Sequence, residues 1–224
     1  MKEIKINLYS FDELSEDAQQ RVIENERSGI VEFGCELLND DYSGTLKAFC
    51  ELFCIRYQTN NHYWSWFVTW DFKHQQFPYM ACDDKDVAGK YVLRFLNRHY
   101  YDLLHRKTIY GKRKYDENGK YIGFKKFTSR CEWVDDGCPL TGLYCDCDIL
   151  EPIRKYLKKP DGSTLGELID DCFNNLVKSW NEEYLYLHTD EYARQELTES
   201  GNYDDALYYS DGTKYTGPVS ESAA

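Results

Sequence analysis

The sequence contains no apolar run long enough to cross a bilayer and no signature of a familiar catalytic site. A membrane-spanning helix needs about 20 predominantly apolar residues, and no stretch of the 224 residues approaches that length. The opening residues, Met1–Ile6, lack the apolar segment of a secretory signal. Phosphate-binding glycine loops, Gly-x-Ser-x-Gly and His-Glu-x-x-His are missing as well. These absences predict a soluble cytoplasmic protein, and they point to no catalytic residue and to no cofactor.

Cysteine occurs nine times, an odd number without the spacing of a disulfide framework, which favours reduced thiols. The paired Cys-x2–4-Cys knuckles of a structural zinc site are also missing. The alternation in Leu143–Ile149 predicts a strand with Cys145 and Cys147 on its buried face. Asp146 and Asp148 on the other face are expected to be solvated rather than to hold a divalent cation. We therefore predict no metal site.

The negative charge is unevenly distributed along the chain. The net charge is −12, with 39 acidic and 27 basic side chains. Residues 1–84 carry a net charge of −8, residues 85–160 carry +7 and residues 161–224 carry −11. A binding partner would therefore meet surfaces of opposite sign on the middle and on the flanks of the chain.

Three of the five tryptophans fall in one alternating stretch, Tyr63–Phe72. At the two-residue period of a strand, Trp64, Trp66 and Trp70 share one face with Val68 and Phe72. Aromatic and β-branched residues in this pattern favour a central core strand. The alternative is that the face forms the wall of a ligand pocket, with His62 beside it. The candidate pocket residues are His62, Trp64, Trp66 and Trp70.

Helical periodicity and capping signals account for most of the remaining chain. After a predicted strand at Lys2–Tyr9, Ser15 is a favourable N-cap for a helix that Ser28-Gly29 is expected to end near Arg27, with two further helical stretches before Phe53. The spacing predicts helices over Asp86–Lys107 and from the capping box at Thr164–Glu167 to Leu187, and a last one from Thr189 to Glu199. Asp211-Gly212 predicts a terminal hairpin.

These elements predict an α+β fold with a mixed or mainly antiparallel sheet packed against several helices, including a long C-terminal helix. We expect a single domain over residues 1–215 and a disordered tail over residues 216–224.

The region between Arg106 and Arg130 combines positive charge with aromatic residues. Asn118-Gly119 is a strong signal for a two-residue hairpin turn, flanked by Lys112–Tyr115 and Lys120–Phe127. Cations and aromatic rings on a two-stranded ribbon suit phosphate contact and base stacking. The alternative is a solvated edge that lysines protect from aggregation. The candidate binding residues are Lys112, Arg113, Lys114, Tyr115, Tyr121, Phe124, Lys125 and Lys126.

Both ends of the chain carry patterns that resemble a known group of proteins. The opening has Phe11-Asp12-Glu13-Leu14-Ser15-x-x-Ala18, and the end has Glu183-Tyr184-x-Tyr186, Asp190-Glu191 and Asp211-Gly212. These patterns resemble those of small acidic proteins encoded by bacteriophages and prophages. The resemblance implies a shared fold and a phage origin, hence a place in the cytoplasm of a bacterial host cell, and no functional residue is carried over from it.

Three functions of different classes remain open. The leading expectation is a non-enzymatic phage accessory protein that binds and inhibits a host protein, such as a component of antiviral defence. The first alternative is a module that binds and sequesters nucleic acid or a nucleotide signal through the basic hairpin. The second is a small enzyme with an unrecognised site. The sequence does not decide the oligomeric state.

Overall fold

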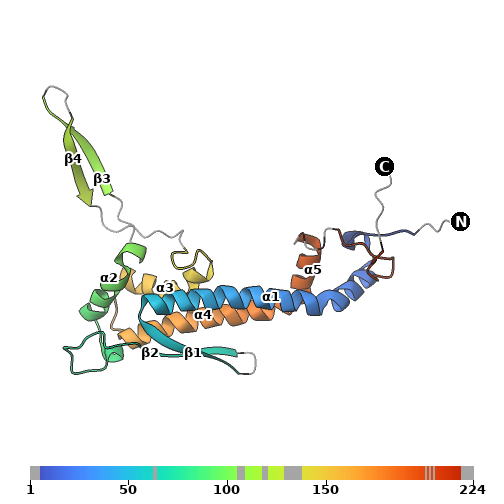
Figure 1. Cartoon of the computed structure of the whole chain (residues 1–224), viewed down its shortest axis with the longest axis horizontal. Coiled ribbons are helices and arrows are strands. Elements are labelled where there is room, and N and C mark those ends of the chain that lie inside the picture. Colours follow the sequence, from blue (N-terminus) through green and yellow to red (C-terminus); the bar gives the residue numbers. More distant parts are fainter. Residues whose placement is uncertain are drawn as a thin grey trace. The chain divides into compact units, whose positions relative to one another are not determined.

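The computed structural model describes residues 6–62, 65–104, 109–117, 121–128, 138–199, 201, 203 and 205–217. The chain is α+β, as predicted: five α-helices and two antiparallel β-hairpins are described (Figure 1). Within the described residues, no helix combines the length and apolarity needed to cross a membrane. The single domain expected over residues 1–215 stays a prediction, and within the chain the contacts group into two compact units. The end unit comprises residues 1–40 and 182–224, and the middle unit comprises residues 41–181.

The first long helix, α1, runs without interruption from Glu16 to Leu52. The expected break at Ser28-Gly29 and the three separate helices are therefore wrong. A glycine inside a helix costs only about 1 kcal/mol relative to alanine. Burial of Ile30, Leu38 and Leu46 along one side of the helix outweighs that cost. Ser15 caps the helix as predicted, because its Oγ accepts from the backbone N–H of Ala18 at 3.4 Å.

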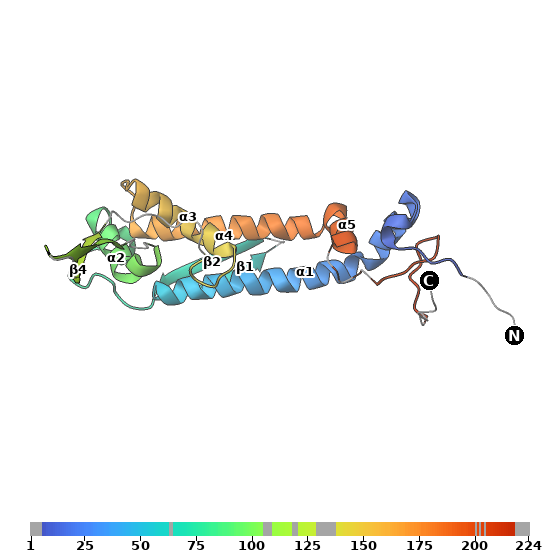
Figure 2. The same cartoon turned by 90° about the horizontal axis from the view of Figure 1, so that it is seen from above.

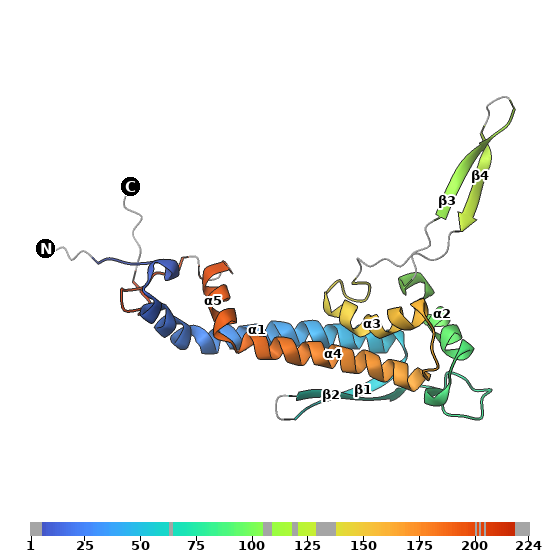
Figure 3. The same cartoon turned by 180° about the vertical axis from the view of Figure 1, so that it is seen from behind.

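In the middle unit, α1 packs antiparallel to α4, which spans Leu165–Leu187. The ring of Tyr42 stacks on Trp180 with centroids 5.4 Å apart, and Phe49 meets Phe173 edge-on at 5.6 Å. The β1–β2 hairpin lies along one side of this helix pair and α3 along the other (Figure 1, Figure 3). The predicted capping box opens α4: Thr164 N donates to Glu167, and Glu167 N donates to Thr164 Oγ1.

The tryptophan segment forms a two-stranded ribbon rather than a central core strand. β2, Ser65–Phe72, pairs antiparallel with β1, Ile55–His62. The predicted alternation is present, since Phe72 is buried, Trp70 is half-buried, and Thr69 and Asp71 are exposed. With β1 as its partner, β2 buries Phe72 and half-buries Trp70 at the end that meets the helices. β1 was not predicted because most of its residues are polar.

The strand predicted at Leu143–Ile149 is wrong, because this segment begins helix α3, Cys145–Lys158. Cys145, Ile149 and Ile153 are buried at the four-residue spacing of a helix. Over a segment as short as Leu143–Ile149, apolar residues at every second position fit a strand as well as a helix. Figure 2 shows α3 over α4. The helix continues through Pro152, although proline lacks the N–H that would donate to the carbonyl of Asp148. Asn175 of α4 donates to that oxygen instead, at 2.6 Å.

Asp146 is fully buried, which corrects the expectation that its carboxylate would be solvated. Its oxygens accept from the backbone N–H groups of Leu140 and Thr141, each at 2.8 Å, and from the Thr45 hydroxyl at 2.9 Å. The carboxylate thus ties the turn before α3 to α1. Its hydrogen bonds explain how a charged group is accommodated in the core.

The middle unit also contains two helical segments and a second hairpin. Helix α2 spans Lys90–Leu104, inside the predicted Asp86–Lys107, and a short 3-10 helix, η2, covers Asp84–Asp86 before it. The predicted basic hairpin is confirmed in its backbone: β3, Ile109–Tyr115, pairs antiparallel with β4, Tyr121–Thr128. Its Asn118-Gly119 turn lies outside the described residues.

The end unit brings the two ends of the chain together (Figure 2). Tyr9 and Tyr208 exchange two backbone hydrogen bonds of 2.9 Å, which is the described remnant of the strand predicted at Lys2–Tyr9. A short 3-10 helix, Phe11–Glu13, precedes α1, and helix α5 covers Asp190–Glu199 behind the predicted cap, Thr189. The core residues are Phe11, Leu14, Ala18, Val22, Ile23, Ile30, Ala193, Leu197 and Tyr208.

The predicted turn at Asp211-Gly212 closes against the start of α1. Gly212 has φ +86°, and a Cβ there would lie 2.5 Å from the carbonyl oxygen of Ala18. Only glycine fits this contact without displacement. The opening and closing patterns in the sequence therefore describe two sides of one packed interface.

Candidate functional site

One exposed side of α1 in the end unit alternates acidic and large apolar residues. It consists of Glu32, Phe33, Glu36 and Leu37, which we call the α1 face. Phe33 is 50% exposed and Leu37 is 52% exposed, one helical turn apart. Both glutamates are exposed as well. Large side chains at this spacing on an acidic helix are typical of a surface that a partner covers.

Phe33 and Leu37 lie outside the core because α1 packs through a glycine beside them. A Cβ at Gly34 would lie 2.9 Å from Tyr192 Oη and 3.3 Å from Leu187 Cδ2. This close approach buries Ile30 and Leu38, which share that side of the helix. The neighbouring Phe33 and Leu37 are left at the edge of the packed interface.

Glu32 and Glu36 make no hydrogen bond or ion pair in the part of the chain that the structure describes. They stand one turn apart, where like charges destabilise an isolated helix by about 0.2–0.5 kcal/mol. The arrangement therefore gives no benefit to the fold of the end unit. A cationic partner would relieve the repulsion.

A small notch of about 290 Å³ adjoins the α1 face. Its lining consists of Gly29, Ile30, Phe33, Glu196 and Tyr203. The apolar lining, the tyrosine ring and the carboxylate match the aliphatic stem and the charged end of a lysine or arginine. The notch thus has the size and chemistry for one basic side chain.

The tyrosines around the notch show that the local potential is negative. Burial, then Glu26 and Glu196, raise the pKa of Tyr203. Burial and Glu196 raise the pKa of Tyr192 to about 12. Nearby carboxylates therefore disfavour a tyrosinate here and favour a cation.

The chain itself places one cation in this environment. Lys214 Nζ lies 5.3 Å from the centre of the Tyr203 ring and 3.3 Å from both carboxylate oxygens of Glu26. Residues 1–40 and 182–224 carry 20 acidic and 6 basic side chains, a net charge of −14, whereas the whole chain carries −12. The end unit therefore accounts for the acidity of the protein.

The residues proposed from the sequence as a basic binding surface lie in β3 and β4. The register pairs Lys112 with Lys125, and Arg113 with Phe124. Two lysines directly opposite each other disfavour pairing of the strands, so this register is compatible with an anionic partner. The arrangement of the side chains lies outside the described structure, and binding by this hairpin stays a prediction.

Of the proposed pocket wall, Trp70 is described in full. Its indole Nε1 donates to Asp170 Oδ1 on α4 at 2.5 Å, and its ring lies 5.9 Å from that of Phe173. Trp70 thus fastens the ribbon to the helix pair. Trp64 and the side chains of His62 and Trp66 lie outside the described residues.

Among the cysteines and aspartates considered as metal ligands, Cys138 interacts with Cys147 and lies near Asp146. No group of three or more His, Cys, Asp or Glu side chains suited to a metal ion occurs among the described residues. Cys145 is buried and Asp146 is held by the N–H groups of its own turn. Cys131, Asp135 and Asp136 are not described.

Sequence reasoning missed the α1 face, because Phe33 and Leu37 were interpreted only as part of a separate helical stretch between Ser28-Gly29 and Phe53. Gly34 could have served as a signal, since a glycine between large residues in a long helix often marks close packing.

The chain matches no family model, and no similar sequence was found among curated proteins or similar fold among solved structures.

Proposed function

We propose that the protein binds a partner protein through the α1 face and the adjoining notch, and that the partner presents a basic, amphipathic segment. The observation that carries the proposal is the alternation of two unpaired glutamates with two half-exposed apolar side chains on one helix. Charge complementarity would set the association rate and the orientation, and the apolar pair would supply the central contact. The resemblance to phage proteins supports a host protein as the partner, inhibited by being covered.

A synthetic amphipathic helix with lysines on one side and leucines on the other serves as the probe in a fluorescence anisotropy titration. We expect Leu37→Ser and the pair Glu32→Gln/Glu36→Gln each to weaken binding about tenfold or more. The matched controls lie in the same unit but off the face. They are Leu185→Ser, which changes another exposed leucine, and Asp12→Asn/Glu24→Gln, which removes the same charge.

Equal losses in the face variants and the controls would show that net charge alone attracts the peptide, and the proposal would be wrong. Binding that survives Leu37→Ser and Glu32→Gln/Glu36→Gln would contradict it as well. Circular dichroism of each variant verifies that the helices are intact.

A further inference from the structure

The middle unit contains a cleft of about 560 Å³ between α2 and the segment that follows β2. Its volume falls in the range of small-ligand pockets, about 300–1,000 Å³. The described lining combines aromatic and apolar side chains with cationic and amide groups, and no carboxylate occurs among these described residues. The residues are His74, Gln75, Gln76, Phe77, Pro78, Tyr79, Met80, Tyr91, Arg94, Phe95 and Arg98.

Arg94 and Arg98 supply the strongest positive charge at the cleft. They are exposed and one turn apart on α2, so both guanidinium groups can reach the same ligand. Within the described residues neither arginine has a hydrogen bond or an ion pair. The chain has a net charge of −12, yet none of its described carboxylates pairs with these two arginines, so a bound anion would neutralise them.

His99 adjoins two residues of the cleft lining, Phe95 and Arg98. His99 stacks against Phe95 with ring centroids 4.7 Å apart. Burial lowers the pKa of His99, and its interactions with Arg98 and His74 lower it further. The guanidinium charges of Arg94 and Arg98 would attract a phosphate group.

Aromatic side chains form the other half of the cleft. The ring of Phe77 lies edge-on to that of Tyr91, with centroids 6.2 Å apart, and its centroid is 6.4 Å from that of Phe95. Two neighbouring rings therefore hold Phe77 in place. Tyr79 is 99% exposed beside Pro78 at the mouth. A free tyrosine ring next to a cationic pair offers a stacking surface for a planar group.

The loop lining the cleft is fixed by a buried carboxylate. Asp84 accepts from the backbone N–H groups of Gln76 and Phe77, the second at 2.9 Å. Gln76 Nε2 donates to the carbonyl of His74 at 2.8 Å. Because Asp84 is bonded to the loop itself, it does not neutralise the arginines. The cleft is therefore formed before a ligand arrives.

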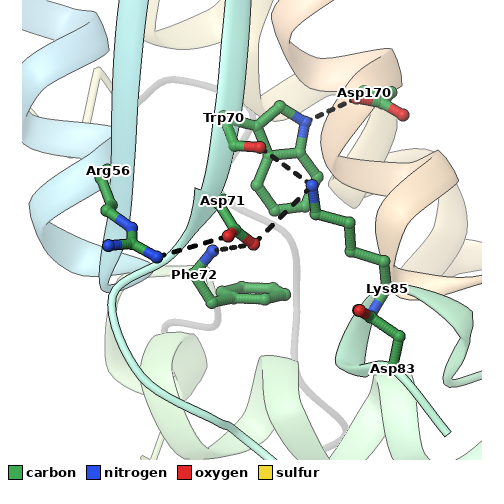
Figure 4. Close-up of polar contacts among 7 residues, drawn as sticks. All are labelled: Arg56, Trp70, Asp71, Phe72, Asp83, Lys85 and Asp170. Carbon is green, nitrogen blue, oxygen red and sulfur yellow. Dashed lines mark hydrogen bonds and ion pairs between the residues drawn. The ribbon is translucent and has the colours of Figure 1, made fainter.

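Lys85 anchors this segment to β2 (Figure 4). Its Nζ donates to the carbonyl of Trp70 at 2.9 Å, lies 4.2 Å from the centre of the Trp70 ring, and stands 3.8 Å from Asp71. A Cβ at Gly166 would lie 2.9 Å from Lys85 Cβ, so the first turn of α4 presses against the same residue. These contacts hold Lys85 and its segment against β2 and the first turn of α4.

A second groove, of about 690 Å³, lies between α3 and α4 but has a different charge balance. Lys155, Lys158, Lys159 and Lys178 line it together with Asp161 and Asp171. Lys155 also pairs with Glu151 at 3.4 Å. Its cations have anionic neighbours, unlike those of the cleft.

We infer that the cleft between Phe77 and Arg98 binds a small phosphate-bearing ligand with a planar ring, which is the chemistry of a nucleotide. Arg94 and Arg98 contact the phosphate, and Tyr79 with Phe77 contacts the ring. The site is separate from the α1 face and does not depend on the function proposed for that face.

Isothermal titration calorimetry of the full chain with AMP, ATP, a cyclic dinucleotide and inorganic phosphate tests the inference. We expect at least one nucleotide to bind, and Arg94→Gln/Arg98→Gln to weaken that binding about tenfold or more. The control Lys47→Gln/Lys159→Gln removes the same charge outside the cleft and, through Lys159, examines the second groove. Tyr79→Ser should weaken nucleotide binding about fivefold or more, whereas Phe67→Ser, at another exposed aromatic ring, should not.

Several results would overturn the inference. One is the absence of binding by any of these nucleotides at millimolar concentration, and another is unchanged binding in the arginine pair variant. Equal affinity for phosphate and nucleotides, with no effect of Tyr79→Ser, would exclude recognition of a ring. Preference for a single-stranded oligonucleotide that occupies several nucleotides would assign the surface to nucleic acid instead. Thermal melts verify that each variant is folded.

Discussion

Asn175 on α4 donates a hydrogen bond of 2.6 Å to the carbonyl oxygen of Asp148 on α3. In a regular helix the N–H of residue 152 would donate to this oxygen, but residue 152 is proline. The side chain of one helix thus replaces a missing backbone donor in another. This explains how α3 extends through a residue that normally ends a helix.

A double-mutant cycle measures this replacement. Asn175→Ala should lower the free energy of unfolding by about 1–2 kcal/mol, because a carbonyl loses its donor. The same change should cost less in a Pro152→Ala background, where the new N–H can donate to Asp148. Urea denaturation gives both values, and Asn174→Ala, at an exposed neighbour, should shift stability by less than about 0.5 kcal/mol. If Asn175→Ala lowered the free energy of unfolding equally in wild type and in the Pro152→Ala background, Asn175 would not be replacing the missing N–H of residue 152.

Replacement of Asp146 should be more damaging. Asp146→Asn substitutes an amide group for an oxygen that accepts from backbone N–H groups, and the part-buried donors of Leu140 and Thr141 lose part of their pairing. We expect a loss of about 3 kcal/mol in the free energy of unfolding. Glu151→Gln on the same helix removes only an exposed ion pair and should cost less than about 0.5 kcal/mol. A loss below 1 kcal/mol for Asp146→Asn would contradict the role assigned to its carboxylate.

The state of His99 should make stability depend on pH. Burial, Arg98 and His74 lower its pKa, so the folded chain favours the neutral imidazole. The unfolded chain takes up a proton near pH 6.5, before the folded one does. The contribution of neutral His99 to the free energy of unfolding is therefore fully present above about pH 6.5. It is lost as the pH falls toward the lowered pKa of the folded state.

This loss can be separated from other acid effects by comparing wild type with His99→Phe. Chemical denaturation at pH 7.5 and pH 5.5 should show a smaller drop for the variant. A variant that loses as much stability as wild type over this interval would show that His99 is not responsible.

Gly212 and Gly89, two of the four described glycines with a left-handed backbone, make a matched pair. Gly89→Ala has φ +61° and open space around its new Cβ, so it should cost about 1 kcal/mol from backbone strain alone. Gly212→Ala adds a clash with the carbonyl of Ala18 and should cost about 2–4 kcal/mol in a denaturation experiment. Similar losses at the two positions would mean that the contact with Ala18 is easily relieved.

The sequence predicted most reliably those elements whose signals are local. The capping box at Thr164, the cap at Ser15 and the turn at Asp211-Gly212 are all confirmed, because each depends on residues within one turn. The α1 helix was divided wrongly because the cost of Gly29 is local, whereas the stabilisation comes from contacts with the distant end of the chain. The candidate surfaces depend on such contacts as well: nothing within two turns of Arg94 shows that a loop around Phe77 will face it.

The end unit combines residues 1–40 with residues 182–224, and this affects how it folds during synthesis. Arg21 and Asp211, whose guanidinium and carbonyl groups are 3.4 Å apart, are separated by 190 residues. At about 5–20 residues per second, a ribosome takes about 10–40 s to cover that interval. Until then, the apolar stripe of Val22 and Ile23 has no completed partner surface, and it is available to chaperones or to neighbouring chains. The middle unit can form first, and in doing so it shortens the loop that the last segment must close.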